Sequence, residues 1–123
     1  MKKVYLAGPI FGVQDPASWR KEAIRLLPKG WQAVNPLDLE VSIDRPTHLV
    51  QTDLDALARC DAVLVRAEEP SYGTAMELFH ASRTLDIPVI AWPCHGERSP
   101  WLTVHVSEFF NTLKEAVGAL AHV

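Results

Sequence analysis

The stretch Ala62-Val63-Leu64-Val65 is apolar at every position. A short strand without alternation between apolar and polar residues is typical of a parallel sheet that is covered by helices on both faces. Similar short runs are predicted as strands at residues 4–7, 31–34 and 87–92. A proline follows each of these three runs within two residues and marks the end of the strand.

Segments with helical periodicity separate these strands. Helices are expected over residues 18–27, 46–59 and 74–85, and a last helix is expected from Thr112, which forms a capping box with Glu115. A short fifth strand or turn is expected around residues 104–109. The expected inner faces of the second and third helices consist of Val50, Leu54, Leu57 and Ala58, and of Ala75, Leu78, Phe79, Ser82 and Leu85. Strands that alternate with helices at this spacing predict an α/β fold with a parallel sheet.

Length and composition limit the classes of function that this chain can have. The 123 residues suit a single domain, and a 48% hydrophobic content can fill a core. A net charge of −3 argues against sequence-independent nucleic-acid binding, which needs a basic surface. The first apolar run is too short for a signal peptide, no segment approaches a membrane span, and two cysteines make no disulfide framework. A cytoplasmic protein that binds a small molecule, without nucleic acid or membrane, is therefore expected.

Glu77 lies near the edge of the sheet where ligands bind. Parallel sheets bind ligands at the carboxyl ends of their strands, here residues 8–9, 68–73 and 92–93. One interpretation is structural, because Thr74 and Glu77 have the spacing of a capping box. The other is catalytic, because a carboxylate near the start of a helix can be held ionised and act as a nucleophile.

Two further residues have both structural and chemical interpretations. Asp53 neighbours Leu49, Val50 and Leu57 on the helical repeat, so it lies on or beside the apolar face. It either caps a loop N–H or has a raised pKa and acts as a general acid. Tyr5 lies inside the first strand, where its hydroxyl needs a partner if it is buried.

Metal and phosphate motifs are weak in this chain. The stretch Gly8-Pro9-Ile10-Phe11-Gly12 lacks the spacing of a Walker A or dinucleotide-binding fingerprint. The histidines and cysteines, including the adjacent Cys94 and His95, do not have the paired spacing of a zinc site. No metal is expected.

Three blocks of sequence, in this order and spacing, carry a resemblance to a known family. They are Tyr5-Leu6-Ala7-Gly8-Pro9-Ile10-Phe11, Asp53-Leu54-x-x-Leu57-x-x-Cys60-Asp61 and Gly73-Thr74-Ala75-Met76-Glu77. Together they resemble the nucleoside 2-deoxyribosyltransferase family, including the related 2′-deoxynucleoside 5′-phosphate N-hydrolases. The resemblance implies a flavodoxin-like three-layer sandwich with a five-stranded parallel sheet. It also implies no cofactor and a homodimer or higher homo-oligomer.

The resemblance implies a catalytic role for three side chains. Glu77 matches the family's nucleophile, which attacks C1′ and forms a covalent deoxyribosyl ester. Asp53 matches the aspartate that handles the departing base, and Tyr5 matches the tyrosine that orients the nucleophile. Such a displacement has an oxocarbenium-like transition state, which a nearby negative charge stabilises. The implied substrate-binding residues are Gly8, Pro9, Ile10, Ser71, Gly73, Met76 and Ser99.

The chain departs from the family pattern at two places. Many of the transferases have an aspartate six residues before the nucleophile, where this chain has Ser71, which resembles the nucleotide hydrolases. In relatives, a polar residue from a neighbouring subunit completes the site. Ser99 and His105 are candidates for that residue, with Ser99 preferred as a phosphate donor, and both also fit an exposed loop.

The function that the resemblance implies is cleavage of the N-glycosidic bond of a (deoxy)nucleoside or nucleotide, with transfer of the sugar to a second base. Hydrolysis of a deoxynucleoside 5′-monophosphate is the alternative that Ser71 supports. A non-catalytic nucleotide-sensing domain is an alternative of a different class, because a fold alone does not determine function.

Overall fold

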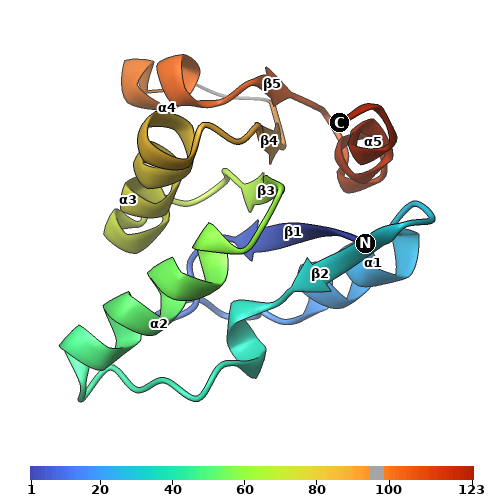
Figure 1. Ribbon diagram of the computed structural model, residues 1–123. Coiled ribbons are helices and arrows are strands. Elements are labelled where there is room, and N and C mark those ends of the chain that lie inside the picture. Colours follow the sequence, from blue (N-terminus) through green and yellow to red (C-terminus); the bar gives the residue numbers. More distant parts are fainter. Residues whose placement is uncertain (95–98) are drawn as a thin grey trace.

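Five strands pair in parallel in the order β2-β1-β3-β4-β5. The computed structural model describes residues 1–94 and 99–123 (Figure 1). The strands are β1 (Lys2–Ala7), β2 (Trp31–Val34), β3 (Ala62–Arg66), β4 (Val89–Trp92) and β5 (Glu108–Phe109). This topology confirms the α/β fold with a parallel sheet that the sequence predicts and the flavodoxin-like five-stranded sheet that its resemblance implies.

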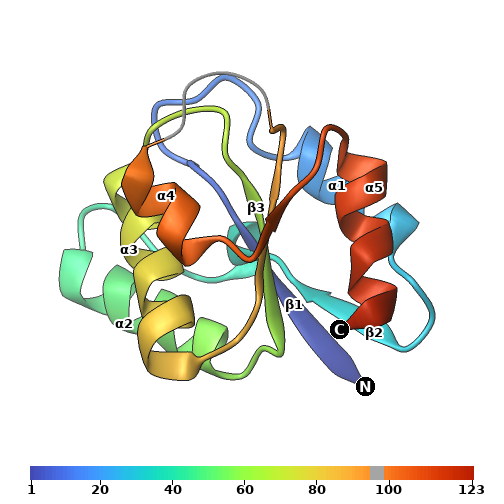
Figure 2. The ribbon, with the colours of Figure 1, turned by 90° about the horizontal axis from the view of Figure 1, so that it is seen from above.

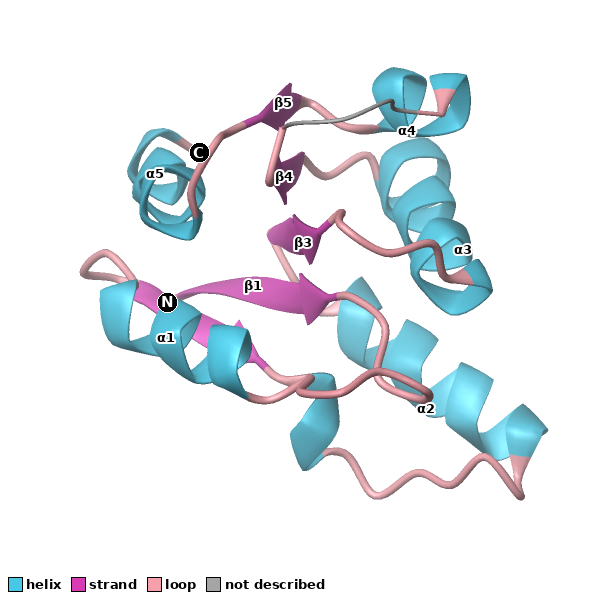
Figure 3. Cartoon of the chain, turned by 180° about the vertical axis from the view of Figure 1, so that it is seen from behind, coloured by secondary structure: helices cyan, strands magenta, loops and turns pink. Residues whose placement is uncertain are grey.

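Helices cover both faces of the sheet. On one side lie α1 (Ser18–Leu26) and α5 (Leu113–Gly118), and on the other lie α2 (Pro46–Ala58), α3 (Tyr72–His80) and α4 (Pro100–His105) (Figure 2). Shorter helical segments are Pro36–Asp38, Ala81–Leu85, which continues α3 as a π-helical turn, and Ala119–His122. The view from behind shows the same three layers (Figure 3).

The central strands are buried on both faces, as the uninterrupted apolar sequence predicted. In β3, Val63 and Val65 pack on the side of α2 and α3, whereas Ala62 and Leu64 pack on the side of α1 and α5. All four side chains are fully buried. Burial of each valine or leucine side chain contributes about 1.5–3 kcal/mol to the free energy of unfolding.

Helix α3 begins two residues earlier than predicted. Ser71 is its N-cap residue and its Oγ accepts a hydrogen bond from the Thr74 N–H at 3.3 Å. Glu77 is therefore in the second turn of the helix, and the capping-box interpretation of Thr74 and Glu77 is wrong. Thr112 is the N-cap residue of α5 as predicted, with Oγ1 accepting from the Glu115 N–H at 3.2 Å, and the Glu115 carboxylate accepts from the Thr112 hydroxyl.

Other differences concern the later part of the chain and the helix faces. Helix α4 was not predicted, and β5 is only two residues long. In α2 the fully buried residues are Ala56 and Leu57, whereas Val50 is 53% exposed. Phe79 of α3 is also exposed. These apolar side chains border a cavity instead of the core, which the helical period alone does not distinguish.

Candidate active site

The site is built around a hydrogen bond between strand β1 and helix α3. Tyr5 is fully buried, on the face of the sheet that packs against α2 and α3. Its hydroxyl donates a hydrogen bond to Oε2 of Glu77 at 2.5 Å. The buried tyrosine thus has the partner that its hydroxyl requires, and the partner is the carboxylate that the resemblance implied.

Asp53 of α2 lines the same cavity as Tyr5 and Glu77. Its Oδ1 is buried and has no hydrogen-bond partner among the residues that the structure describes. Burial raises the pKa of Asp53 above the usual range for an aspartate. Because no loop N–H of the described residues bonds this carboxylate, the capping interpretation of Asp53 is wrong.

The cavity has a volume of about 440 Å³ and lies between α2 and α3 at the carboxyl end of β1. Nine of the ten predicted site residues line it: Tyr5, Gly8, Pro9, Ile10, Asp53, Ser71, Gly73, Met76 and Glu77. Additional lining residues, which the sequence analysis did not single out as binding residues, are Phe11, Pro36, Leu49, Val50, Leu54, Thr74, Phe79 and His80. The unpaired apolar face of α2 and the i, i+3 spacing of Glu77 and His80 are the signals that point to them.

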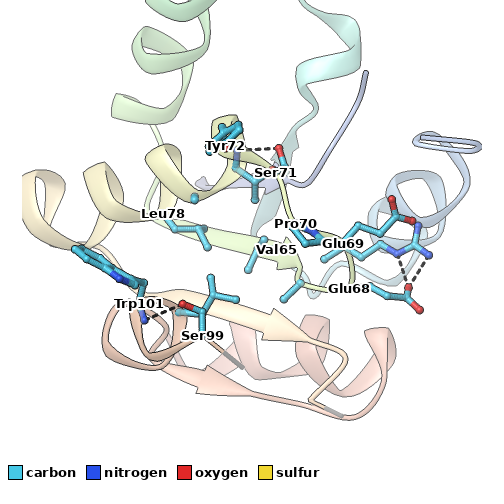
Figure 4. Close-up of a pocket in the computed structure, with 14 residues that line it drawn as sticks. Val65, Glu68, Glu69, Pro70, Ser71, Tyr72, Leu78, Ser99 and Trp101 are labelled. Carbon is cyan, nitrogen blue, oxygen red and sulfur yellow. Dashed lines mark hydrogen bonds and ion pairs between the residues drawn. The ribbon is translucent and has the colours of Figure 1, made fainter. Parts of the chain in front are cut away.

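Ser99 does not line this cavity. It lines a second cavity of about 570 Å³, which lies between α3 and α4. Figure 4 shows Ser71 and Tyr72 on one side of that cavity and Ser99 and Trp101 on the other. Ser99 is the N-cap residue of α4 and accepts a hydrogen bond from the Trp101 N–H. His105 is buried against Arg83 and the Trp101 carbonyl, so its exposed-loop interpretation is wrong.

Three solved structures resemble this chain over most of its length. A 2-deoxyribosyltransferase from Leishmania mexicana has a TM-score of 0.77 at 19% identity, with 99% of this chain and 98% of that chain covered. The chain has the deoxyribosyltransferase fold. A 2-deoxyribosyltransferase from Bacillus psychrosaccharolyticus has a TM-score of 0.69 at 24% identity, covering 94% of this chain and 90% of that chain.

The same fold occurs in a nucleotide-cleaving enzyme. The CMP N-glycosidase BcmB of Clostridium botulinum has a TM-score of 0.67 at 23% identity, with 98% of this chain and 99% of that chain covered. No protein-family model and no curated protein sequence matches the chain. At these identities the structural likeness establishes the deoxyribosyltransferase fold, and the activity has to be argued from the site.

Electrostatics at the floor of the cavity favour a carboxylate that changes charge near neutrality. Burial raises the pKa of Glu77 to about 7, against the opposing effects of the Tyr5 hydrogen bond and the charge of Arg20. The charge of Asp53 acts in the same direction as burial. Burial and the neighbouring Glu77 raise the pKa of Tyr5, so its hydroxyl keeps its proton and donates a hydrogen bond to Glu77.

Metal chemistry has no evident ligand set in the described part of the chain. Residues 1–94 and 99–123 contain no group of three or more His, Cys, Asp or Glu side chains that could hold a metal ion. Cys60 and Cys94 are free, and His95 lies outside the described residues.

None of the described helices has the length and apolar character needed to cross a bilayer.

We predict that Glu77 destabilises the folded chain at neutral and higher pH. Because its pKa rises from 4.5 to about 7, the folded chain keeps a proton over a range where the unfolded chain loses it. The stability from this group is fully present below pH 4.5 and is lost as the pH rises to about 7. Glu77→Gln should therefore raise the free energy of unfolding at about pH 8 by on the order of 1–3 kcal/mol and have little effect at about pH 4.

Urea denaturation at both pH values measures this difference. Glu40→Gln, which changes an exposed carboxylate, is the matched control and should show no such dependence on pH. An equal effect of Glu77→Gln at both pH values would contradict the prediction.

Proposed function

We propose that this chain, residues 1–123 as one domain, cleaves the N-glycosidic bond of a deoxynucleoside and transfers the sugar to a second base. The observation that carries the proposal is the Tyr5–Glu77 hydrogen bond at the floor of a cavity that Asp53 also lines. A carboxylate nucleophile and a second carboxyl group beside one binding cavity are the groups that a retaining glycosyl transfer needs. The shared fold with deoxyribosyltransferases supports the same conclusion.

In the first step, Glu77 attacks C1′ of the sugar. Tyr5 holds Oε2, so Oε1 is the free oxygen that forms the new bond. The C1′–N bond breaks and its electron pair leaves with the base. The departing base takes up a proton from the protonated form of Asp53, whose share burial of this carboxyl group increases.

In the second step, a nitrogen of another base attacks C1′ of the glycosyl ester. The C1′–Oε1 bond breaks, the Glu77 carboxylate is regenerated, and the proton of the attacking base returns to Asp53. Apolar side chains that include Leu49, Val50 and Met76 line the cavity and can pack against a base.

Ser71 supports a second candidate, a 2′-deoxynucleoside 5′-monophosphate N-glycosidase. Its Oγ uses a lone pair to cap the Thr74 N–H, so the hydroxyl proton is free to donate to a phosphate. Ser71 stands at the start of α3, where the helix dipole favours an anion. Among the described residues, no arginine or lysine lines the catalytic cavity. The Ser71 hydroxyl and the start of α3 would therefore have to hold the phosphate.

We predict that Glu77→Gln lowers the rate of base release by at least about 10²-fold, because the amide cannot form the glycosyl ester. Wild-type kcat/KM should rise with pH through about 7, where Glu77 loses its proton. The measurement is chromatography of incubations with deoxynucleosides and their 5′-monophosphates, with and without adenine as acceptor.

The products separate the candidate functions. An exchanged nucleoside supports the transferase, and free base without exchange supports the hydrolase. Binding of a nucleoside without turnover would support a sensing domain instead. Glu40→Gln is the control, and equal turnover by wild type and Glu77→Gln would remove Glu77 from the mechanism.

Ser71→Asp tests whether a phosphate is accepted at the start of α3. Aspartate is as good an N-cap residue as serine, so the helix should be retained. Its charge should repel a 5′-phosphate and lower kcat/KM for nucleotides by about 10-fold or more relative to nucleosides. The two kcat/KM values are compared with those of Ser42→Asp, which lies on an exposed loop away from the cavity. Equal losses for nucleosides and nucleotides would contradict a phosphate-binding role.

We also propose that the chain forms a homodimer or a higher homo-oligomer through α3 and α4. Exposed large apolar side chains gather on these two helices: Tyr72, Met76, Phe79, Trp101 and Val104. Tyr72 is 90% exposed and Trp101 is 72% exposed. An apolar surface of this kind, beside a site, is typical of an interface.

We predict that Trp101→Glu lowers the apparent mass of the particle in solution, because it places a charge in the apolar contact. Analytical ultracentrifugation over a range of concentrations measures the change. Ile24→Glu, which alters an exposed apolar residue of α1 on the other face of the sheet, is the control. A monomeric wild type, or the same mass for wild type and Trp101→Glu, would contradict the proposal.

A further inference from the structure

Arg20 of α1 is fully buried although no carboxylate of the described residues forms an ion pair with it. Its guanidinium group instead donates three hydrogen bonds to backbone carbonyls. Nε donates to Leu6 O at 3.2 Å, Nη1 to Pro16 O at 2.7 Å and Nη2 to Gly8 O at 2.9 Å. Burial of an unpaired charge is costly, so this arrangement calls for an explanation beyond packing.

The three carbonyls belong to the end of β1 and to the loop that follows it. Leu6 is next to Tyr5, and Gly8 lines the catalytic cavity together with Pro9. Arg20 also stacks on the Trp19 ring, with its Cζ 4.6 Å from the ring centroid. One planar group thus holds both ends of the loop that forms a wall of the cavity.

The fit around Gly8 is close. A Cβ atom at this position would lie 3.2 Å from the Trp19 ring and 3.4 Å from Nη2 of Arg20. The backbone of Gly8 therefore rests directly on the side chains of α1. A displacement of the guanidinium group would move the wall against which a substrate packs.

The charge of Arg20 also reaches the catalytic pair. Its positive charge lowers the pKa of Glu77 and that of Tyr5, in opposition to burial. Burial lowers the pKa of Arg20 to about 10, so the group is protonated at neutral pH. The other charged groups that act on these residues are Asp53, on Glu77 and Tyr5, and Arg66, on Arg20.

We propose that Arg20 is a positioning residue for the glycosyl transfer, which sets the Gly8–Pro9 wall through its three hydrogen bonds and places a buried positive charge behind the Tyr5–Glu77 pair. It acts from the opposite face of the sheet and hydrogen-bonds neither Glu77 nor Tyr5. The inference rests on the proposed function for its kinetic part, whereas its electrostatic part does not depend on turnover.

Two variants separate the geometry from the charge. Arg20→Lys keeps the charge but replaces a planar group with five donors by a single ammonium group, which cannot hold three carbonyls in the same way. Arg20→Met removes the charge and the donors while it keeps much of the volume. Arg25→Met is the matched control, because Arg25 lies on the same helix and is exposed.

The experiment combines kinetics with a direct titration of Glu77. Steady-state kinetics with a deoxynucleoside give kcat and KM, and thermal melting reports folding. Carbon-13 NMR of glutamate-labelled protein gives the pKa of Glu77, with Glu77→Gln used to assign its signal.

Arg20→Lys is expected to raise KM by about 10-fold or more and to leave the Glu77 titration near its wild-type position. Arg20→Met is expected to raise the pKa of Glu77 and to lower kcat/KM by about 100-fold, with the rising limb of the pH profile shifted to higher pH. If Arg20→Met does not fold, Arg20→Lys and its KM still test the geometric part.

The outcomes distinguish failure of this inference from failure of the proposed function. Arg20 variants that match Arg25→Met in both titration and kinetics would overturn the role of Arg20, while Glu77-dependent turnover would leave the proposed function intact. If the wild type has no turnover, the Glu77 titration in the Arg20 variants decides the electrostatic part alone.

Discussion

The hydrogen bond from Tyr5 to Glu77 joins strand β1 to helix α3 at the floor of the cavity. The strand side of this contact is rigid because β1 pairs on both sides, with β2 and β3. A buried carboxylate needs a partner to keep its charge, and a buried hydroxyl needs an acceptor. The contact meets both requirements, and it orients the carboxylate in the cavity between α2 and α3.

The charged groups around this contact influence whether Glu77 is ionised. Asp53 approaches from α2 and adds a second negative charge, which opposes ionisation of Glu77. Arg20 opposes that effect from the other side of the sheet. The site is therefore a balance between burial, two carboxylates and one remote guanidinium group. Such a balance is typical of sites where proton transfer occurs near neutral pH.

The first four strands and their order along the chain could be predicted from sequence because each contains a short apolar run, and a proline follows three of these runs within two residues. The start of α3 was misplaced, since Ser71 and Thr74 are both acceptable N-cap residues and local sequence does not choose between them. Helix α4 was missed because it is a single short helix whose stability comes from packing against α3.

About half of the residues that line the cavity could be predicted, in part because they lie at the carboxyl ends of strands and in part because three sequence blocks resemble a known family. Their catalytic roles remain a proposal. Ser99, predicted as the residue through which a neighbouring subunit completes the site, lines the second cavity of its own chain, and its role in a neighbouring site stays a prediction. Arg20 was overlooked although it lies between Trp19 and Ala23 on the apolar face of α1. A charged residue on such a face was the available signal.

The first turn of α3 has cavities on both of its sides. Ser71 and Thr74 line the cavity that contains Asp53 and Glu77 and also the second cavity beside α4. This turn of helix thus separates the two cavities and forms part of the wall of each. A ligand that displaces this turn from one cavity changes the shape of the other cavity. Substitutions at Ser71 or Thr74 therefore alter both cavities together.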